Sequence, residues 1–339
     1  MDIVCNTRCM NAALTGVQRY TKNILGFFPE KPECVQPPEK WSRGIKGHLW
    51  EQVALTGKLH KKLLWSPSNS GPLSYSNQVV TIHDVVSADH PEWFNKAYVK
   101  WYNYMLPRLC KKARHIITVS DFTKSRIMEL YRVAETKITR VYNGCDDLTT
   151  IPVNGSGLMR TPFKQYVLAL GSLEPRKNIP LLLASWKNIG NKIPPGTGLI
   201  IVGGKGNARI FKDAGINEIP GQVVFTGHLK DEHVAQLYRN ALAFVYLSVY
   251  EGFGLPPLEA MSAGTPVITG DRTSLPEVVG DAGLKIDPYS QLECENALIE
   301  LINDRELRML LAARSKIRAK RFTWEKASTD TWQVLQNFN

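Results

Sequence analysis

Short apolar runs alternate with amphipathic stretches along most of the chain. In the first 145 residues, "MDIVCN", "QVVTIHDVV", "HIITVS" and "ITRVYNG" predict buried strands. Between them, "TGVQRYTKNILGFF", "HLWEQVALTGKLHKK", "PEWFNKAYVKWYNYMLPRLCKKA" and "DFTKSRIMELY" predict helices. We expect Thr15 to cap the first of these helices and Pro91 to start the third, and we expect residues 29–47 to form a loop.

The same rhythm returns after a break. "DDLTTIPVNGSGLMRTP" has no periodicity and many turn formers, so we place a domain boundary between residues 157 and 158. Beyond it, "QYVLALGS", "GLIIVGG", "VVFTGHL", "AFVYLS", "TPVITG" and "LKIDP" predict strands separated by helices. This alternation predicts an α/β fold with two doubly wound parallel sheets, in domains 1–157 and 158–322. The pattern assigns no packing partner to a final helix at 323–339, for which the first domain is one candidate.

Charge is distributed unevenly between the two halves. The net charge is +11, of which +9 falls in residues 1–160, where 22 Lys and Arg face 13 Asp and Glu. A basic half suits nucleic acid, an acidic membrane surface or a phosphorylated ligand, although solubility alone explains it equally well. No nucleic-acid motif is visible, and a nucleic-acid-binding protein is the non-enzymatic alternative.

Other features of the sequence bear on where the protein is located and on whether it binds a metal. The chain has no apolar run of 18 residues, and its first residues lack the basic and apolar regions of a signal peptide. Six scattered cysteines without a CxxC pair indicate reduced thiols, so we expect a cytoplasmic protein. No histidine or cysteine motif predicts a metal, and "VGGKGN" lacks the spacing of a phosphate loop.

The stretch "VYEGFGLPPLEAMSAGTPVITG" predicts a ligand site. Glu251 directly follows a strand, and Gly252, Gly254 and Pro256 exclude a helix interior there, so we expect Glu251 on an exposed loop. A helix then begins near Pro256 and places Glu259 in or just after its first turn. Ligands of doubly wound sheets bind outside the carboxyl ends of the strands, and with two such domains we expect the site in a cleft between them.

The residue types around that helix start suit a sugar nucleotide. Free amides at a helix N-terminus bind phosphates, and carboxylates accept hydrogen bonds from hydroxyls. A pyrophosphate with a sugar at each end would use Glu251 for one sugar and Glu259 for the other. The adjacent cations Arg176 and Lys177 in "LGSLEPRKN" would meet the phosphate charge without a metal. The alternative is that Glu259 only complements the dipole of its helix and that Glu251 is a solvated loop residue. We expect Asp146 and Asp147, in the turn between the domains, to be solvated rather than to bind a metal.

The stretch "EGFGLPPLEAMSAGTPVI" resembles the E-x(7)-E signature of retaining glycosyltransferases of family 4, which have the GT-B fold. "TGVQRY", "VTIHDVV", "VSDFTKSRI", "VYNGCD", "LALGSLEPRKNIPLLLASW", "IIVGG", "FTGHL", "SLPEVVGDAG" and "FTWEKAS" follow the family's order over most of the chain. The narrower likeness is to bacterial mannosyl- and hexosyltransferases of surface polysaccharide assembly. It implies GDP-mannose or a UDP-hexose as donor, a saccharide or lipid-linked saccharide as acceptor, and no metal or cofactor.

The resemblance implies a role for individual residues. His83 would contact the transferred sugar and position it, with Asp84 orienting the imidazole. Gly171-Ser172 stands where the family often has Gly-Arg, so Arg176 would supply the missing charge beside Lys177. The implied catalytic residues are His83, Arg176, Lys177 and Glu251. The implied donor-binding residues are Gly16, Ser172, Arg176, Lys177, Leu229, Asp231, Glu251, Gly252, Phe253, Gly254, Leu255 and Glu259.

Two questions stay open at this level. A relative of the same fold that epimerises UDP-N-acetylglucosamine is an alternative enzyme, and it would turn over substrate without an acceptor. The helix at 91–113 carries six Trp, Phe and Tyr residues together with lysines, which suits either a membrane interface or a core-facing helix with a basic outer side. Peripheral association with the inner face of the plasma membrane is expected in the first case.

Overall fold

The computed structural model describes residues 2–11, 15–42, 44–148, 161–203, 216 and 218–339. These residues form two compact units. Unit 1 comprises residues 1–144 and 322–339, and unit 2 comprises residues 145–321. The predicted boundary between residues 157 and 158 lies outside the described residues.

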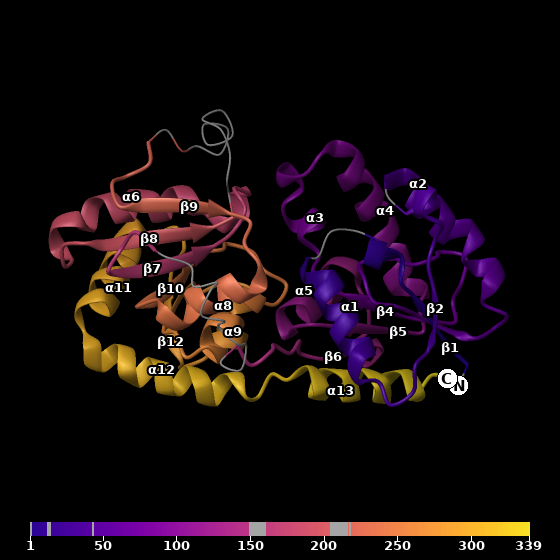
Figure 1. The fold of residues 1–339 in the computed structure, drawn as a ribbon. Helices are drawn as coiled ribbons and strands as arrows, with labels where there is room; N and C mark the ends of the chain where they lie inside the picture. Colours follow the sequence, from indigo (N-terminus) through magenta and orange to yellow (C-terminus); the bar gives the residue numbers. More distant parts are fainter. Residues whose placement is uncertain (1, 12–14, 43, 149–160, 204–215, 217) are drawn as a thin grey trace. The chain divides into compact units, whose positions relative to one another are not determined.

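Unit 1 is built on a six-stranded sheet in which every neighbouring pair of strands is parallel (Figure 1). In the order β2-β1-β3-β4-β5-β6, the strands are Glu33–Val35, Ile3–Asn6, Leu63–Ser66, Gln78–Ile82, His115–Thr118 and Ile138–Arg140. Its helices are α1 (Gly16–Phe27), α2 (Gly44–Leu49), α3 (Val86–Asp89), α4 (Lys96–Lys112), α5 (Asp121–Tyr131) and α13 (Trp324–Gln336).

Several local predictions for unit 1 were wrong. The stretch expected to be a loop contains β2, and the buried strand β3 was not predicted. The helix expected to start at Pro91 begins at Lys96, because Asn95 accepts a hydrogen bond from the Tyr98 amide and caps it, while Pro91–Trp93 forms a separate 3-10 turn. The helix expected at residues 48–62 is α2, a π-helical turn (Trp50–Ala54) and a 3-10 turn.

Helix α4 faces the core. Met105, Leu106, Leu109 and Cys110 are buried in the apolar cluster of unit 1, and Trp101 is among the partly buried residues that pack against it. Lys111 and Lys112 are exposed at the end of the helix. Of the two roles that the sequence left open for this helix, the contacts favour a core-facing helix with a basic outer side.

The C-terminal helix α13 packs against α1, as Figure 1 shows. The Ser328 hydroxyl donates to the Ile24 carbonyl at 2.9 Å, and the Trp332 and Phe28 rings lie 4.8 Å apart. The chain crosses itself where α13 begins, since a Cβ on Gly144 would lie 2.1 Å from the Trp324 nitrogen. A glycine is required at that crossing. The sequence "ITRVYNG" was predicted as a strand that ends in an Asn-Gly turn, which gave no sign of this crossing.

Unit 2 repeats the architecture with a second six-stranded parallel sheet. In the order β12-β11-β10-β7-β8-β9, the strands are Gly283–Ile286, Val267–Gly270, Ala243–Tyr246, Gln165–Leu170, Thr197–Val202 and Val223–Gly227. Its helices are α6 (Ile179–Ile189), α8 (Asp231–Asn240), α9 (Leu255–Ser262), α10 (Leu275–Val279), α11 (Gln291–Asn303) and α12 (Arg305–Ala319). The prediction of two doubly wound parallel sheets is confirmed.

The strand order of unit 2 identifies where a ligand should bind. From β7 the chain proceeds to β8 and β9 on one side, and then returns to add β10, β11 and β12 on the other. The order therefore reverses between β7 and β10, and ligands of open α/β sheets bind at the carboxyl ends of the strands at such a switch point. The apolar strands β7 and β10 are buried, so the polar side chains that follow them are held on a rigid base. Among the described helices of the chain, none has the length and apolarity to cross a bilayer.

Candidate active site

Two loops meet at the switch point of unit 2. Residues 171–178 follow β7 and lead through a 3-10 turn (Pro175–Lys177) into α6, while residues 247–254 follow β10 and lead into α9. The Arg176 carbonyl accepts hydrogen bonds from the Val249 amide at 2.8 Å and from the Ser248 hydroxyl at 3.0 Å. These bonds fix the first loop against the second.

One carboxylate oxygen gathers the polar side chains of both loops. Glu251 Oε1 lies 2.6 Å from Lys177 Nζ and 2.9 Å from Arg176 Nη1. The same oxygen accepts hydrogen bonds from the Tyr246 hydroxyl at 2.8 Å and the Ser248 hydroxyl at 2.7 Å. Because all four contacts go to Oε1, the second oxygen, Oε2, takes part in none of them. We call these five residues the Glu251 cluster.

The charges of the Glu251 cluster determine its protonation. Burial alone would raise the pKa of Glu251, but the charges and hydrogen bonds of Lys177 and Arg176 outweigh it and lower that pKa to about 2. Burial and the neighbouring Arg176 lower the pKa of Lys177, and its pairing with Glu251 opposes this. Burial also raises the pKa of the Tyr246 hydroxyl well above its usual value. Glu251 is therefore an ionised hydrogen-bond acceptor at neutral pH.

The prediction that Glu251 is exposed was wrong. Glu251 does lie on a loop, but its side chain is only 12% exposed, and that of Lys177 is 10% exposed. Partners close in space but 74 positions apart in the chain cover it. The predicted pair Arg176 and Lys177 does come together with Glu251. Ser172 lies at the rim, where its hydroxyl donates at 2.6 Å to Glu174, which also pairs with Arg176 at 2.7 Å.

The glycine-rich loop before α9 has a backbone conformation that requires glycine at position 254. Gly254 has φ +111°, and a Cβ at this position would lie 2.8 Å from Leu275 Cδ2. The buried Ser274 hydroxyl is hydrogen-bonded to the Glu251 and Phe253 carbonyls at 2.9 and 2.8 Å. The loop therefore leads into the N-terminal end of α9, where Leu255 carries an amide N–H without an intrahelical partner and Pro256 and Pro257 carry none.

Glu259 belongs to a different group of side chains. It lies in the second turn of α9 and is half-buried, and its Oε2 accepts a hydrogen bond from the Tyr238 hydroxyl at 3.4 Å. Pro256 and Pro257 occupy the first turn, as predicted. The two glutamates of the signature thus flank the start of α9, one before it and one inside it.

Other predicted donor contacts follow the edge strand β9. Leu229 is half-buried in the loop after this strand, and Asp231 is exposed. Asp231 is the first residue of α8, and Lys230 occupies the capping position. The implied role of both residues in donor binding remains a prediction.

Two predicted site residues lie in unit 1. Gly16 is the first residue of α1 and is exposed. His83 follows β4 and is only 8% exposed. Its Nε2–H donates to the Pro67 carbonyl at 2.8 Å, and its backbone amide donates to Asn69 Oδ1 at 2.6 Å. Burial lowers the pKa of His83 to about 4, so the imidazole is neutral at physiological pH.

Asp84 has a structural partner next to His83. Its Oδ1 accepts a hydrogen bond at 3.2 Å from the Val86 amide at the start of α3. The imidazole itself contacts the Pro67 carbonyl and lies in a T-shaped arrangement with the Tyr20 ring, at 4.8 Å between ring centroids. The expected role of Asp84 in orienting the imidazole stays a prediction.

Sequence reasoning missed three hydroxyl residues of the site. Tyr246 ends β10, Ser248 follows it, and Ser274 precedes α10; all three are at most 3% exposed. The sequence did offer a signal for Tyr246. It ends a strand that otherwise reads "AFV", and a polar residue at the carboxyl end of a buried strand indicates a ligand site.

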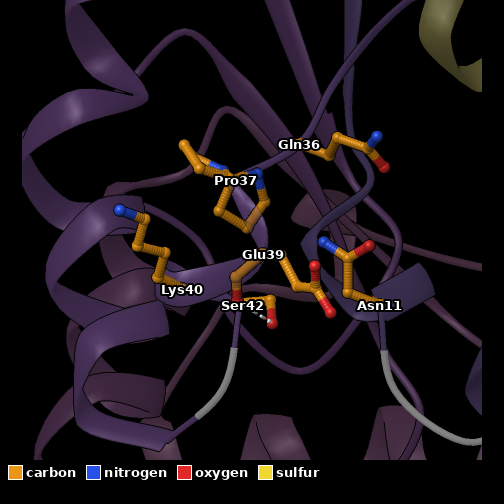
Figure 2. Close-up of a pocket in the computed structure, with 7 residues that line it drawn as sticks. Asn11, Gln36, Pro37, Glu39, Lys40 and Ser42 are labelled. Carbon is orange, nitrogen blue, oxygen red and sulfur yellow. Dashed lines mark hydrogen bonds between the residues drawn. The ribbon is translucent and has the colours of Figure 1, made fainter.

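Unit 1 contains a separate cavity of about 620 Å³ beside the loops that follow β1 and β2. Figure 2 shows its lining, which consists of Asn11, Gln36, Pro37, Pro38, Glu39, Lys40 and Ser42. None of the predicted site residues lines it.

Asp146 and Asp147 are exposed, and most of "VGGKGN" lies outside the described residues. Within the part of the chain that the structure describes, no group of three or more His, Cys, Asp or Glu side chains is placed to hold a metal ion.

Two known families match separate parts of the chain. Residues 161–318 match the family "Glycosyl transferases group 1", and residues 73–147 match "Glycosyltransferase Family 4". O-antigen chain mannosyltransferase B of Escherichia coli is 34% identical over 77% of this chain and 70% of that protein. O-antigen chain mannosyltransferase RfbU of Salmonella typhimurium is 31% identical over 70% of this chain and 64% of that protein.

Solved structures share the fold over nearly the full length. WaaG, a glycosyltransferase involved in lipopolysaccharide biosynthesis, has a TM-score of 0.73 at 17% identity, with 98% of this chain and 99% of that chain covered. HepE of Anabaena, solved with UDP and glucose, has a TM-score of 0.74 at 16% identity and 99% coverage of both chains. The chain belongs to the group 1 glycosyltransferases, with a family 4 match in its first half and the GT-B fold that its motifs predicted.

Proposed function

We propose that the chain is a retaining, metal-independent hexosyltransferase of bacterial cell-surface polysaccharide biosynthesis. It moves mannose from GDP-mannose to a hydroxyl of a saccharide or lipid-linked oligosaccharide. The observation that carries this proposal is the Glu251 cluster, which joins Lys177 and Arg176 to a carboxylate at the switch point between β7 and β10. A diphosphate linked to a sugar needs cations and a hydrogen-bond acceptor side by side.

The donor diphosphate is held by Lys177, Arg176 and the amides of residues 252–255. These groups are fixed before the donor arrives, because Glu251 and the loop hydrogen bonds hold them. A hydrogen-bond donor that is already oriented toward the charge developing on the leaving group stabilises the transition state by about 3 kcal/mol. Cations and amides therefore supply the leaving-group stabilisation that a metal would otherwise give.

Glu251 has two roles in this proposal. Its Oε1 orients both cations, and its Oε2 accepts a hydrogen bond from a hydroxyl of the transferred hexose. Glu259, one turn into α9, holds a ribose hydroxyl of the nucleotide. His83 is neutral and its Nε2–H is donated to Pro67, so its Nδ1 accepts a hydrogen bond at the sugar and positions it without acting as a general base.

The reaction follows a front-face displacement. The bond between the anomeric carbon and the phosphate oxygen breaks, and the acceptor oxygen forms its bond to that carbon on the same face. The departing phosphate takes the acceptor proton. The configuration at the anomeric carbon is retained without a covalent enzyme intermediate.

Two mannosyltransferases among the relatives support a GDP-mannose donor, whereas HepE, solved with UDP-glucose, shows that the fold also accepts a UDP-hexose. The deciding experiment incubates the purified chain with GDP-mannose, UDP-glucose, UDP-galactose and UDP-N-acetylglucosamine and measures nucleotide release without and with acceptor extracts. We expect release from GDP-mannose that rises when acceptor is added. Release from none of these donors would refute the proposed activity.

A further inference from the structure

Two cysteines of unit 1 lie opposite each other on neighbouring strands. Cys5 is in β1 and Cys34 is in β2, and the parallel pairing of these strands places the two residues in register. Paired residues on adjacent strands direct their side chains to the same face of a sheet. The Cys5 thiol accordingly donates a hydrogen bond to the Cys34 sulfur. We call Cys5 and Cys34 the thiol pair.

The spacing of the two strands suits a covalent bond between the sulfurs. Neighbouring strands lie about 4.8 Å apart, and the Cα atoms of a disulfide are usually about 4.4–6.8 Å apart. The register is fixed next to the thiol pair, because the Thr7 amide donates a hydrogen bond to the Val35 carbonyl at 3.0 Å. A disulfide can therefore join the thiol pair with little movement of either strand.

The two sulfurs of the thiol pair differ in their access to solvent. Cys5 is completely buried, whereas Cys34 lies on β2, the edge strand of its sheet, and is exposed. Of the six cysteines, all of which the structure describes, only Cys34 is exposed. A small reagent therefore meets Cys34 first and reaches Cys5 through it.

The surroundings of Cys34 favour its thiolate, which is the reactive form of a cysteine. The hydrogen bond from Cys5 and the charge of Lys31 lower the pKa of Cys34 to about 7, although partial burial opposes them. The neighbouring acid, Glu33, belongs to the other face of β2 and pairs with Lys62 at 2.9 Å. Burial and the hydrogen bond to Cys34 raise the pKa of Cys5 well above its usual value. The attacking thiol is therefore Cys34, and Cys5 is the thiol that reacts second.

We propose that the thiol pair is a redox-active site that reacts with small-molecule disulfides and closes to a Cys5–Cys34 disulfide. The Cys34 thiolate attacks one sulfur of the reagent, the S–S bond of the reagent breaks, and a first reagent thiolate leaves. Cys5 then gives its proton to solvent and attacks the Cys34 sulfur of the mixed disulfide, and the second reagent thiolate leaves. The two cysteines are oxidised by two electrons in total, and the reagent disulfide takes up the same two electrons.

Cys9 is the competing thiol near the thiol pair. It is half-buried, its Sγ lies 3.5 Å from the Thr21 hydroxyl oxygen, and burial raises its pKa. Cys9 lies in a 3-10 turn (Arg8–Asn11) after β1, beyond the residues that pair β1 with β2. The register therefore favours Cys5 as the second thiol, and Cys9→Ser provides a matched control.

The test mixes the reduced full-length chain with the aromatic disulfide DTNB, which releases a coloured thiolate at each exchange. No sugar donor or acceptor is used, so the result is independent of the proposed transferase activity. We expect a fast phase that releases two thiolates per chain and leaves no reagent attached. Peptide mapping by mass spectrometry should then show Cys5 joined to Cys34. The rate of the first release should be half-maximal near pH 7, where Cys34 ionises.

Single substitutions separate the two steps. Cys34→Ser should slow the first release by at least about tenfold, because the exposed thiolate is lost. Cys5→Ser and Cys5→Ala should release one thiolate and keep the reagent on Cys34. Both should also react about fivefold more slowly at neutral pH, since Cys34 loses the hydrogen bond that stabilises its thiolate. Cys9→Ser should behave like the wild type.

Three results would overturn the proposal. They are reagent that stays attached to Cys34 in the wild type, a fast release that persists in Cys34→Ser, and a disulfide that joins Cys34 to Cys9 or to a second chain. Because Cys5 is buried, its variants could fail to fold. The peptide linkage in the wild type and the loss of the fast phase in Cys34→Ser then decide the outcome.

Discussion

Lys177 Nζ lies 2.6 Å from Glu251 Oε1, and this contact joins the loop after β7 to the loop after β10. Arg176 reaches the same oxygen from the neighbouring position at 2.9 Å. A single carboxylate oxygen thus sets the position of both cations that we assign to the donor phosphates. The stability of the site and its affinity for the donor are therefore coupled, and substitutions should affect both.

Lys177→Ala should weaken binding of GDP and of the donor by roughly tenfold or more, because a fixed phosphate contact is removed. It should also cost about 2 kcal/mol of folding stability, since Glu251 keeps three other donors but loses a buried charge partner. Isothermal titration with GDP and urea unfolding would measure the two effects. Lys187→Ala is the control, because that lysine is 59% exposed and pairs with Glu218 on the surface. Unchanged GDP affinity in Lys177→Ala would contradict the assigned role.

Glu251→Gln keeps the shape of the side chain and removes its charge. We expect kcat/KM for transfer to fall about 100-fold, because the cations lose their orientation and the sugar loses a strong acceptor. Steady-state kinetics with GDP-mannose would measure this. Glu251→Ala is a poorer test, since it also removes the volume of a side chain that is only 12% exposed and leaves Lys177 without its carboxylate partner. A Gln variant with wild-type kcat/KM would remove Glu251 from the mechanism.

The lowered pKa of Glu251 predicts a dependence of stability on pH. Its pKa falls from 4.5 to about 2 on folding, so the ionised carboxylate stabilises the native state above pH 4.5 and this contribution is lost as the pH falls toward 2. The full contribution is about 3 kcal/mol. The difference in unfolding free energy between the wild type and Glu251→Gln should therefore shrink when urea unfolding is repeated from neutral pH down to about pH 3. A constant difference would show that Glu251 is not ionised in the way the contacts imply.

The sequence predicted which residues lie at the strand ends of the site better than it predicted their contacts and burial. Glu251, Arg176 and Lys177 were expected at strand ends, and periodicity with the rule for doubly wound sheets sufficed to place them there. What periodicity could not supply was the pairing of β7 with β10, which brings residues 74 positions apart within 2.6 Å. An isolated Glu after "VY" therefore looked exposed, although the fold covers it.

Local departures from the predicted elements have similar causes. The strand β3 at "LLWS" is short and follows a lysine-rich turn, so its pattern is that of a helix end. Pro91 belongs to a 3-10 turn that precedes α4, and such a turn has no strong sequence signal. Asn95 could therefore not be recognised as the cap of α4 from the sequence alone. Such boundaries are decided by tertiary contacts more than by propensity.

The neutral state of His83 predicts the shape of the activity profile. Burial lowers the pKa of His83 from 6.5 in the unfolded chain to about 4 in the folded chain. The folded chain therefore loses stability as the pH falls from 6.5 to about 4, and its imidazole becomes protonated only below about pH 4. The plot of kcat/KM against pH should show no inflection near 6.5 from this residue. His83→Gln should lower kcat/KM and leave that profile unchanged in shape. A limb near 6.5 in the wild type that disappears in His83→Gln would mean that the imidazole titrates during catalysis.

Gly254→Ala tests whether the backbone before α9 is required. Gly254 has φ +111°, and an added Cβ would meet Leu275 Cδ2 at 2.8 Å, so the loop must move or strain. We expect a loss of about 1–3 kcal/mol in unfolding free energy and of at least tenfold in GDP affinity, because the amides of residues 252–255 are displaced. Gly190→Ala is the matched control, since Gly190 has φ −49° and open space around a Cβ, and its stability should be unchanged or slightly higher. Lost stability with unaltered GDP affinity in Gly254→Ala would show that this turn supports the fold but does not bind phosphate.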